Sequence, residues 1–279
     1  MTTALVPQSG VAAGVPFVAV PPATPSPSAP VVVAWHMMDP PRTEAAFAAA
    51  LPLTALDAWR VYLGLPMSGS RLPAGGFEAL MRLGYEDAVR NLHGPIVEQA
   101  AEEFPAAWSE LRAALGLGDG PVGVLGASTG AAVAQLVLAE GRLRARAAVL
   151  VSPVVQLRAA VDAIARRFGV SYPWSEPSLA VAERVDFVAR AAEIADHGEP
   201  AVLLVVGEND DEAGFREPAA RLREALSSRY THPGRVDMIV VPGMGHALAE
   251  EPGTEPAPQT PHAAAVDRYA ACWLRRQLA

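Results

Sequence analysis

Apolar residues are distributed along the chain in two patterns, continuous short runs and stretches with helical spacing. Short apolar runs rich in valine, leucine and alanine are typical of strands that are buried on both faces. They occupy residues 15–20, 31–35, 59–65, 122–125, 147–152, 201–206 and 236–241. Stretches with helical spacing follow most of them, at residues 43–51, 77–115 with a break at Gly94-Pro95, 129–138, 213–227 and 262–277. The alternation predicts an α/β fold in which a mostly parallel, doubly wound sheet carries helices on both faces.

Two segments fall outside this regular alternation. Residues 21–30, PPATPSPSAP, contain too many prolines for a helix or an inner strand, so we expect an exposed proline-rich loop there. Residues 156–198 contain about three short helical segments, more than a simple crossover between two strands requires. We interpret them as a small helical cap inserted over the carboxyl ends of the strands. The length is compatible with one domain over residues 1–279.

The segment Gly126-Ala127-Ser128-Thr129-Gly130 follows a buried strand and precedes a helix. A sharp turn between strand and helix would strain the backbone at Ser128 and lift its hydroxyl out of the sheet. Only small residues fit two positions before and after such a serine, and Gly126 and Gly130 satisfy this requirement. The pattern predicts a nucleophilic serine, with the Thr129 amide at the helix start directed at a developing oxyanion.

The same segment can also be interpreted as part of a membrane helix. Residues 120–139 carry no formal charge, and Gly126 and Gly130 fit the G-x-x-x-G contact of paired membrane helices. However, the segment contains four glycines, Pro121 and a central Ser-Thr pair, which make its transfer into lipid unfavourable. Its two halves also differ in pattern, so we favour strand, turn and helix.

A serine hydroxyl needs a positioned base, and a third group must orient that base. His246 directly follows the last buried strand, in VVPGMGHAL, where two glycines give a flexible turn. His93, like most of the other histidines, lies in polar or loop surroundings and is expected to be solvated. Asp210 follows another strand, in LLVVGENDDEAG, and is the expected acid, with Asp211 as the alternative.

The order Ser128, Asp210, His246, with the residues around each of them, resembles the α/β-hydrolase superfamily from about residue 15 to the C-terminus. The resemblance implies the α/β-hydrolase fold and a catalytic triad made of these three residues. Acyl transfer by such a triad needs no metal ion or organic cofactor. No cluster in the sequence has the spacing of a metal site.

The resemblance further implies roles for the residues after the strand at 31–35. His36 matches the histidine of the family pattern, Met37 stands where a glycine is usual, and the Met38 amide is implied as an oxyanion donor together with that of Thr129. A methionine in the glycine position departs from the family pattern. The two methionines and His36 would form an adaptable, mainly apolar substrate wall, or the methionines would simply fill the core.

The composition and the N-terminal sequence limit which classes of binding partner and which cellular location are expected. The net charge is −8 and no long basic cluster occurs, so nucleic acids and membranes are not expected as partners. The apolar stretch near the N-terminus follows no positive region and is interrupted by Pro16. A cytoplasmic protein is therefore expected rather than one with a signal peptide. The oligomeric state does not follow from the sequence.

These features predict a serine hydrolase that forms an acyl-enzyme on Ser128. Because no fixed charge is evident near this serine, the expected small-molecule substrate is an ester of a small or medium apolar acyl group. Tyr172 and Trp174 would line or cover its site, or would pack within the cap. A thioesterase for carrier-bound acyl chains is the second hypothesis, and an aminopeptidase-like enzyme that binds a free amine through Glu86 or Asp87 is the third. A non-catalytic binding protein on the same scaffold would be expected to lack a triad member.

Overall fold

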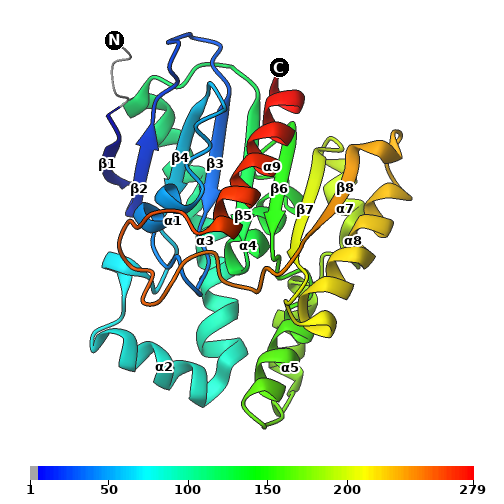
Figure 1. Cartoon of the computed structure of the whole chain (residues 1–279). Coiled ribbons are helices and arrows are strands. Elements are labelled where there is room, and N and C mark those ends of the chain that lie inside the picture. The colour runs from blue at the N-terminus through cyan, green and yellow to red at the C-terminus, as the bar shows by residue number, and fades with distance from the viewer. Residues whose placement is uncertain (1–5) are drawn as a thin grey trace.

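In the computed structural model, residues 6–279 are described, and their strands form one eight-stranded sheet in the order β1-β2-β4-β3-β5-β6-β7-β8. β3 to β8 pair in parallel, whereas β1 and β2 run antiparallel at one edge. The strands are β1 (Gln8–Ala12), β2 (Val15–Val20), β3 (Val31–Trp35), β4 (Trp59–Leu63), β5 (Val122–Ala127), β6 (Ala147–Val151), β7 (Ala201–Gly207) and β8 (Val236–Val241). The predicted mostly parallel α/β sheet is confirmed (Figure 1).

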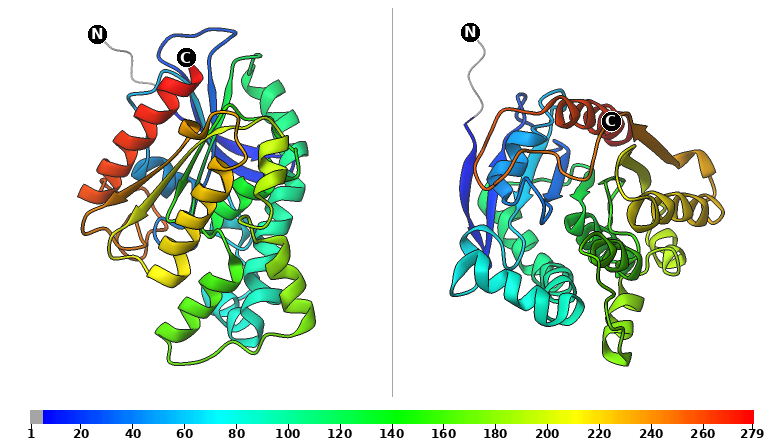
Figure 2. Two further views of the ribbon diagram at one scale, coloured as in Figure 1. Left: turned by 90° about the vertical axis from the view of Figure 1, so that its right-hand side faces the viewer. Right: turned by 60° about the horizontal axis from the view of Figure 1, so that its bottom comes forward.

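Helices pack on both faces of the sheet, as the two views in Figure 2 show. One face carries α1 (Glu44–Ala50) and α9 (Pro261–Leu278), and the other carries α3 (Gly94–Leu115), α4 (Thr129–Ala139), α7 (Ala191–Asp196) and α8 (Glu217–Ser227). Each face has its own buried apolar cluster. α4 is buried along its whole length because it lies between the sheet and α3. Its many alanines allow this close packing.

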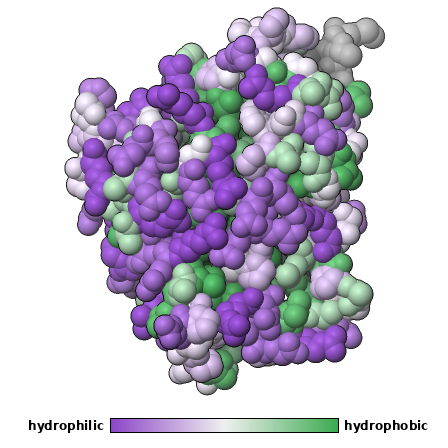
Figure 3. Space-filling model, turned by 180° about the vertical axis from the view of Figure 1, so that it is seen from behind, coloured by the Kyte–Doolittle hydropathy of each residue, from purple (hydrophilic) through white to green (hydrophobic). Residues whose placement is uncertain are grey.

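The membrane interpretation of residues 120–139 does not fit this architecture, because the segment is divided into β5 and the 11-residue α4. None of the helices within residues 6–279 has both the length and the apolar character needed to cross a bilayer. Figure 3, viewed from the side opposite to Figure 1, shows hydrophilic side chains over most of that face, with small apolar areas between them.

Two elements differ from the predicted pattern. β1 was not predicted, because four of its five residues are exposed at the sheet edge and it contains no apolar run. It pairs with β2 through a tight turn at Ala13 and Gly14, which both have positive φ. The long helix predicted over residues 77–115 consists of α2 (Gly76–Asp87), the π-helical η2 (Ala88–His93) and α3. The Asp87 carboxylate accepts the first free amides of η2, so the interruption comes before Gly94-Pro95.

The carboxyl ends of the parallel strands are covered by two segments that extend beyond the sheet (Figures 1 and 2). One consists of α2 and η2. The other contains α5 (Leu157–Arg167) and α6 (Glu176–Arg184), within residues 156–198. Both α5 and α6 contact η2, so the two segments pack against each other. Of the helical cap predicted over residues 156–198, α5 and α6 form part of this cover, whereas α7 packs against α4 and α8 on the face of the sheet.

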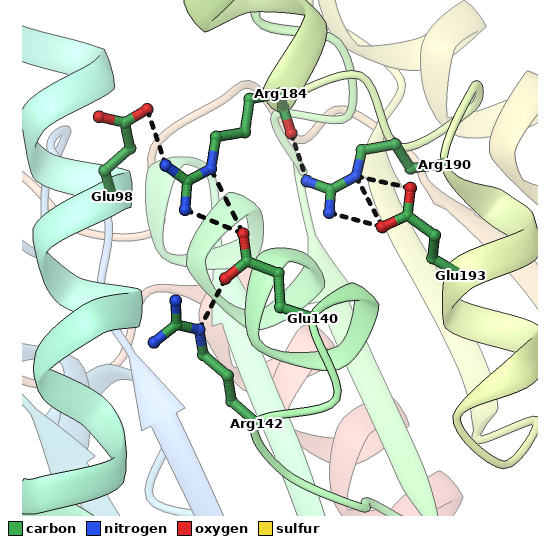
Figure 4. A network of polar contacts seen from close by, with 6 residues as sticks. All are labelled: Glu98, Glu140, Arg142, Arg184, Arg190 and Glu193. Atoms are coloured by element: carbon green, nitrogen blue, oxygen red, sulfur yellow. Dashed lines mark hydrogen bonds and ion pairs between the residues drawn. The ribbon is translucent and has the colours of Figure 1, made fainter.

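A network of ion pairs connects α6 to the helices on the sheet (Figure 4). Arg184, the last residue of α6, lies 3.4 Å from Glu98 on α3 and 2.9 Å from Glu140 at the end of α4. Arg142 binds the other oxygen of Glu140 at 2.6 Å. Burial raises the pKa of the Glu140 carboxyl, but its two arginine partners outweigh this effect and hold it below its usual value. The network therefore fixes one end of the cover to the core.

Candidate active site

Ser128 lies at the tight turn between β5 and α4. Its φ of 48° and ψ of −115° are strained for an L-residue. Its amide donates to the carbonyl of Val151 in the neighbouring β6, at 2.9 Å. A Cβ atom at Gly126 would lie 2.4 Å from the Gly130 carbonyl oxygen, and one at Gly130 would lie 2.1 Å from the His36 carbonyl oxygen. Both glycines of the motif are therefore required by close backbone contacts.

The imidazole of His246 lies between Ser128 and Asp210. Its Nε2 is 2.8 Å from the Ser128 Oγ, and its Nδ1 is 2.9 Å from the Asp210 Oδ2. The Asp210 side chain is 2% exposed, so its charge acts on the ring with little screening by water. With Nδ1 donating to Asp210, Nε2 is the acceptor for the serine hydroxyl. The structure thus brings together the three residues that the sequence singled out.

Asp211, the alternative acid, is directed elsewhere. Its Oδ1 accepts the Gly214 amide at 2.7 Å and lies 3.3 Å from the Arg166 guanidinium. These contacts cap η3 (Glu212–Arg216), the π-helical segment that precedes α8. Asp210 is therefore the aspartate of this pair that contacts His246.

Two further groups contact the His246 ring and were not found from the sequence. The Asp39 Oδ2 lies 3.7 Å from Nε2, and the Phe215 ring lies with its centroid 4.3 Å from that of the imidazole. Burial lowers the pKa of His246, but the hydrogen bond and charge of Asp210, with the charge of Asp39, outweigh this and raise it above 6.5. The one available signal for Asp39 was its position directly after Met38, in the loop that follows the buried strand β3.

A cavity of about 800 Å³ opens over Ser128. α5 and the residue after it contribute much of its wall, through apolar residues such as Leu157, Ile164 and Phe168. Charged groups line it as well, among them Asp39 and Arg167. The expectation that no fixed charge lies near Ser128 was therefore wrong, because the carboxylate of Asp39 comes from a loop whose path the sequence pattern does not define.

His93, predicted to be solvated, also lines this cavity at the end of η2. Burial lowers its pKa to about 4, although the charge of Asp39 acts in the opposite direction. The imidazole is therefore neutral at pH 7. Its place in the wall follows from the packing of η2 under α5 and α6, a contact between distant segments that has no local sequence signal.

The two predicted oxyanion donors, Met38 and Thr129, both line the cavity beside Ser128. Their backbone amides have no hydrogen-bond acceptor among residues 6–279. Thr129 is the first residue of α4, where amides lack an acceptor within the helix. Two free amides thus border the same space as the serine hydroxyl.

His36 and Met37, predicted to bind substrate, are fully buried, and the cavity wall formed by residues 6–279 does not include them. The His36 Nδ1 donates to the Met37 carbonyl at 2.8 Å, and its Nε2 accepts the Leu65 amide at 3.0 Å. Burial lowers the pKa of His36 to about 4, against a smaller opposite effect of the Met37 carbonyl. Met37 packs in the apolar cluster that includes α9. Both residues therefore support the turn after β3, and neither contacts the cavity that residues 6–279 form. For Met37, the alternative prediction is the correct one, namely that its side chain fills the core.

Tyr172 and Trp174, also predicted at the substrate site, stabilise the loop between α5 and α6 instead. Their rings pack edge to face with centroids 4.7 Å apart. The Tyr172 hydroxyl donates to Asp87 at 2.5 Å, and the Trp174 indole donates to Asp162 at 2.8 Å. This occupies the carboxylate of Asp87, one of the two groups considered for a free amine, while Glu86 lies on the outer surface of α2. Of the two alternatives predicted for Tyr172 and Trp174, packing within the cap is therefore the one that fits these contacts.

The part of the chain that the structure describes, residues 6–279, has no group of three or more His, Cys, Asp or Glu side chains that could hold a metal ion.

Comparison with known protein families gives a match over more than half of the chain. Residues 85–260 match the model of the prolyl oligopeptidase family, Peptidase_S9. This segment contains Ser128, Asp210 and His246. A search of curated proteins gave no match.

Several solved structures share the fold. The Thermus thermophilus protein TT1662 is 20% identical, with 99% of each chain covered and a TM-score of 0.69. A puromycin-hydrolyzing peptidase of Mycobacterium tuberculosis is 17% identical, with a TM-score of 0.64 over 98% of this chain and 39% of that one. An esterase from Pyrobaculum calidifontis is 16% identical, with a TM-score of 0.60 over 99% of this chain and 84% of that one. At these identities the likeness establishes the α/β-hydrolase fold.

Proposed function

Since the chain belongs to the prolyl oligopeptidase family, and is a serine hydrolase of the α/β type, we propose that Ser128 is its nucleophile, His246 its general base and Asp210 the acid that orients the base. One observation carries this proposal. The hydrogen bond that His246 Nδ1 donates to Asp210 is 2.9 Å long, and the one that Nε2 accepts from the Ser128 hydroxyl is 2.8 Å long, within the range required for proton transfer.

Hydrolysis then proceeds in two steps. In the first, Nε2 of His246 takes the hydroxyl proton while the Ser128 Oγ attacks the substrate carbonyl carbon. When the resulting tetrahedral intermediate collapses, His246 returns the proton to the leaving alcohol or amine, and the acyl group remains on Oγ. In the second step, His246 takes a proton from water, the hydroxide attacks the acyl-enzyme, and the carboxylic acid leaves as Ser128 regains its proton.

The oxyanion of each intermediate would be bound by the amides of Met38 and Thr129. Both border the cavity at Ser128 and have no acceptor among residues 6–279. Preorganised amides of this kind contribute about 3–4 kcal/mol each to transition-state stabilisation. The positive end of α4 acts at the same place, since Thr129 is its first residue.

We propose an ester of a small or medium acyl group with an apolar side chain as the substrate. The apolar part of the wall, which includes Leu157 and Ile164 of α5 and Phe168 directly after it, supports such a side chain. An amide or peptide substrate is the second candidate, favoured by the match to a peptidase family. Both would use the same acyl-enzyme, and a thioester of similar size would also react by it.

The test is labelling with a fluorophosphonate, followed by a panel of esters, thioesters and amides with the same acyl group. We expect the wild-type protein to be labelled at Ser128 and to hydrolyse esters fastest, because an alkoxide or phenoxide leaves more readily than an amine. Ser128→Ala should abolish labelling without loss of folding. If the folded wild-type protein remains unlabelled while a control serine hydrolase reacts, the proposed function is wrong.

A further inference from the structure

Asp39 lies beside the reacting groups but has no part in the mechanism above. Its Oδ2 is 3.7 Å from Nε2 of His246, the same nitrogen that lies 2.8 Å from the Ser128 Oγ. The carboxylate lines the cavity over Ser128, and half of its side chain is exposed. Any substrate positioned for attack would therefore have this carboxylate close to its acyl group.

Among residues 6–279, no arginine lies within 4.0 Å of the Asp39 carboxylate. Arg42, which lies near it in sequence, is held by Glu251 at 2.8 Å and by the Met38 carbonyl. His93 is neutral at pH 7 because burial lowers its pKa to about 4. His246 must also be neutral when it acts as a base. Arg166 and Arg167 line the same cavity but form no ion pair with Asp39, so its carboxylate is open to the cavity without a bound cation.

We propose that Asp39 binds the protonated α-amine of the substrate, so that the enzyme acts on esters or amides of amino acids with a free amino group. This inference rests on the proposed function, because it requires Ser128 as the nucleophile. It differs from the earlier hypothesis of a free-amine site at Glu86 or Asp87, since those carboxylates lie on the outer surface of α2 or are occupied by Tyr172 and the η2 amides.

The distances fit an amine on the carbon next to the reacting carbonyl. The Ser128 Oγ and the Asp39 Oδ2 lie within about 6.5 Å of each other, the limit set by their distances of 2.8 and 3.7 Å from the same nitrogen. An α-amine nitrogen is about 2.5 Å from its carbonyl carbon. With an attack distance of about 3 Å and a charged hydrogen bond of about 2.8 Å, the substrate can span up to about 8 Å. One aminoacyl group can therefore contact both oxygens.

The rest of the cavity suits the other parts of an aminoacyl group. Apolar residues such as Val154, Leu157 and Phe215 offer a place for an apolar side chain. The Asp39 charge disfavours a substrate whose acyl group carries a carboxylate near the reacting carbon, because two like charges would face each other at short range. An acyl group with its amine acetylated would leave Asp39 without a charged partner.

The experiment compares L-leucine p-nitroanilide and L-leucine methyl ester with their N-acetyl analogues at pH 7, where the α-amine is mostly protonated. We expect wild-type kcat/KM to favour the free amines. Asp39→Asn should lower the ratio of kcat/KM for the free amines to kcat/KM for the acetylated substrates by roughly 10- to 100-fold, as expected for loss of a charge-assisted hydrogen bond. Glu255→Gln, which removes an exposed carboxylate lining a neighbouring hollow, is the matched control and should change neither class.

Two results would overturn the inference while leaving the proposed function intact. If Asp39→Asn reduces both substrate classes equally, the carboxylate acts on the His246 imidazolium rather than on a substrate amine. If wild type is labelled by the fluorophosphonate but does not prefer free amines, no amine site exists. Failure of wild type to be labelled would instead overturn the proposed function, and the amine site with it.

Discussion

Gly130→Ala tests whether the close backbone contact at the serine turn is real. An added Cβ atom would lie 2.1 Å from the His36 carbonyl oxygen and 2.3 Å from that of Trp35. Carbon and oxygen atoms in contact normally lie about 3.3 Å or more apart, so the end of β3 and the start of α4 would have to separate by roughly 1 Å. Both partners are backbone atoms and cannot be relieved by a change of rotamer.

The expected cost is about 3 kcal/mol, the upper end of the usual range for overpacking, because the strain falls on two main-chain segments at once. Intrinsic helix propensity would by itself favour alanine over glycine by about 1 kcal/mol, so the predicted loss has the opposite sign to the propensity effect. For a chain of this size we expect Tm to fall by roughly 6–12 °C. The strain would also displace Met38, so labelling of Ser128 should slow by about tenfold or more.

Thermal unfolding and the rate of fluorophosphonate labelling measure the two effects. Gly234→Ala is the matched control, since a Cβ atom there would meet nothing within 4 Å. It should change the free energy of unfolding by no more than about 0.5 kcal/mol. Equal Tm values and labelling rates for the Gly130 and Gly234 variants would refute the argument from backbone contact.

Three further outcomes follow from the polar groups. Asp210→Asn should lower kcat by roughly 10³- to 10⁴-fold with little loss of folded protein by circular dichroism, because the neutral amide no longer fixes the His246 tautomer; a loss below about tenfold would contradict its role. Since the pKa of His246 is raised, kcat/KM for a neutral ester should increase with pH through an inflection above 6.5, where the ring loses its proton, and an inflection below 6.5 would contradict this. Burial lowers the pKa of His36 from 6.5 to about 4, so its contribution to stability is complete above pH 6.5 and is lost as pH falls towards 4, by about 3 kcal/mol. Urea unfolding at several pH values should show a shallower acid loss for His36→Gln than for wild type, and equal losses would be evidence against the buried neutral ring.

The sequence predicted the parts of the fold that depend on local pattern. The inner strands could be found because they are buried on both faces and are therefore continuously apolar, as in β3, where all five residues are buried. β1 could not be found in this way, because its exposed edge position removes the apolar run. The interruption at η2 depends on the Asp87 carboxylate, which competes for free amides in a manner that periodicity does not reveal.

At the candidate site, residues that follow a strand directly were easier to identify than residues brought in by packing. Ser128, Asp210 and His246 each come soon after the end of a parallel strand, and those ends meet at one edge of the sheet. His93 reaches the same cavity from the end of η2, through contacts between η2, α5 and α6 that join distant parts of the chain. Such contacts have no short-range signal in the sequence.

In the turn after β3, Met37 keeps the backbone path that the proposed oxyanion donor requires, while its side chain packs in the core. Met37 stands where the family pattern has glycine. Among residues 6–279, those other than glycine with positive φ do not include Met37, so its backbone conformation does not require glycine. Its side chain enters the apolar core, whereas Met38 lines the cavity with a free amide. Because an oxyanion donor needs the amide and not the side chain, methionine at position 37 is compatible with the proposed role of Met38.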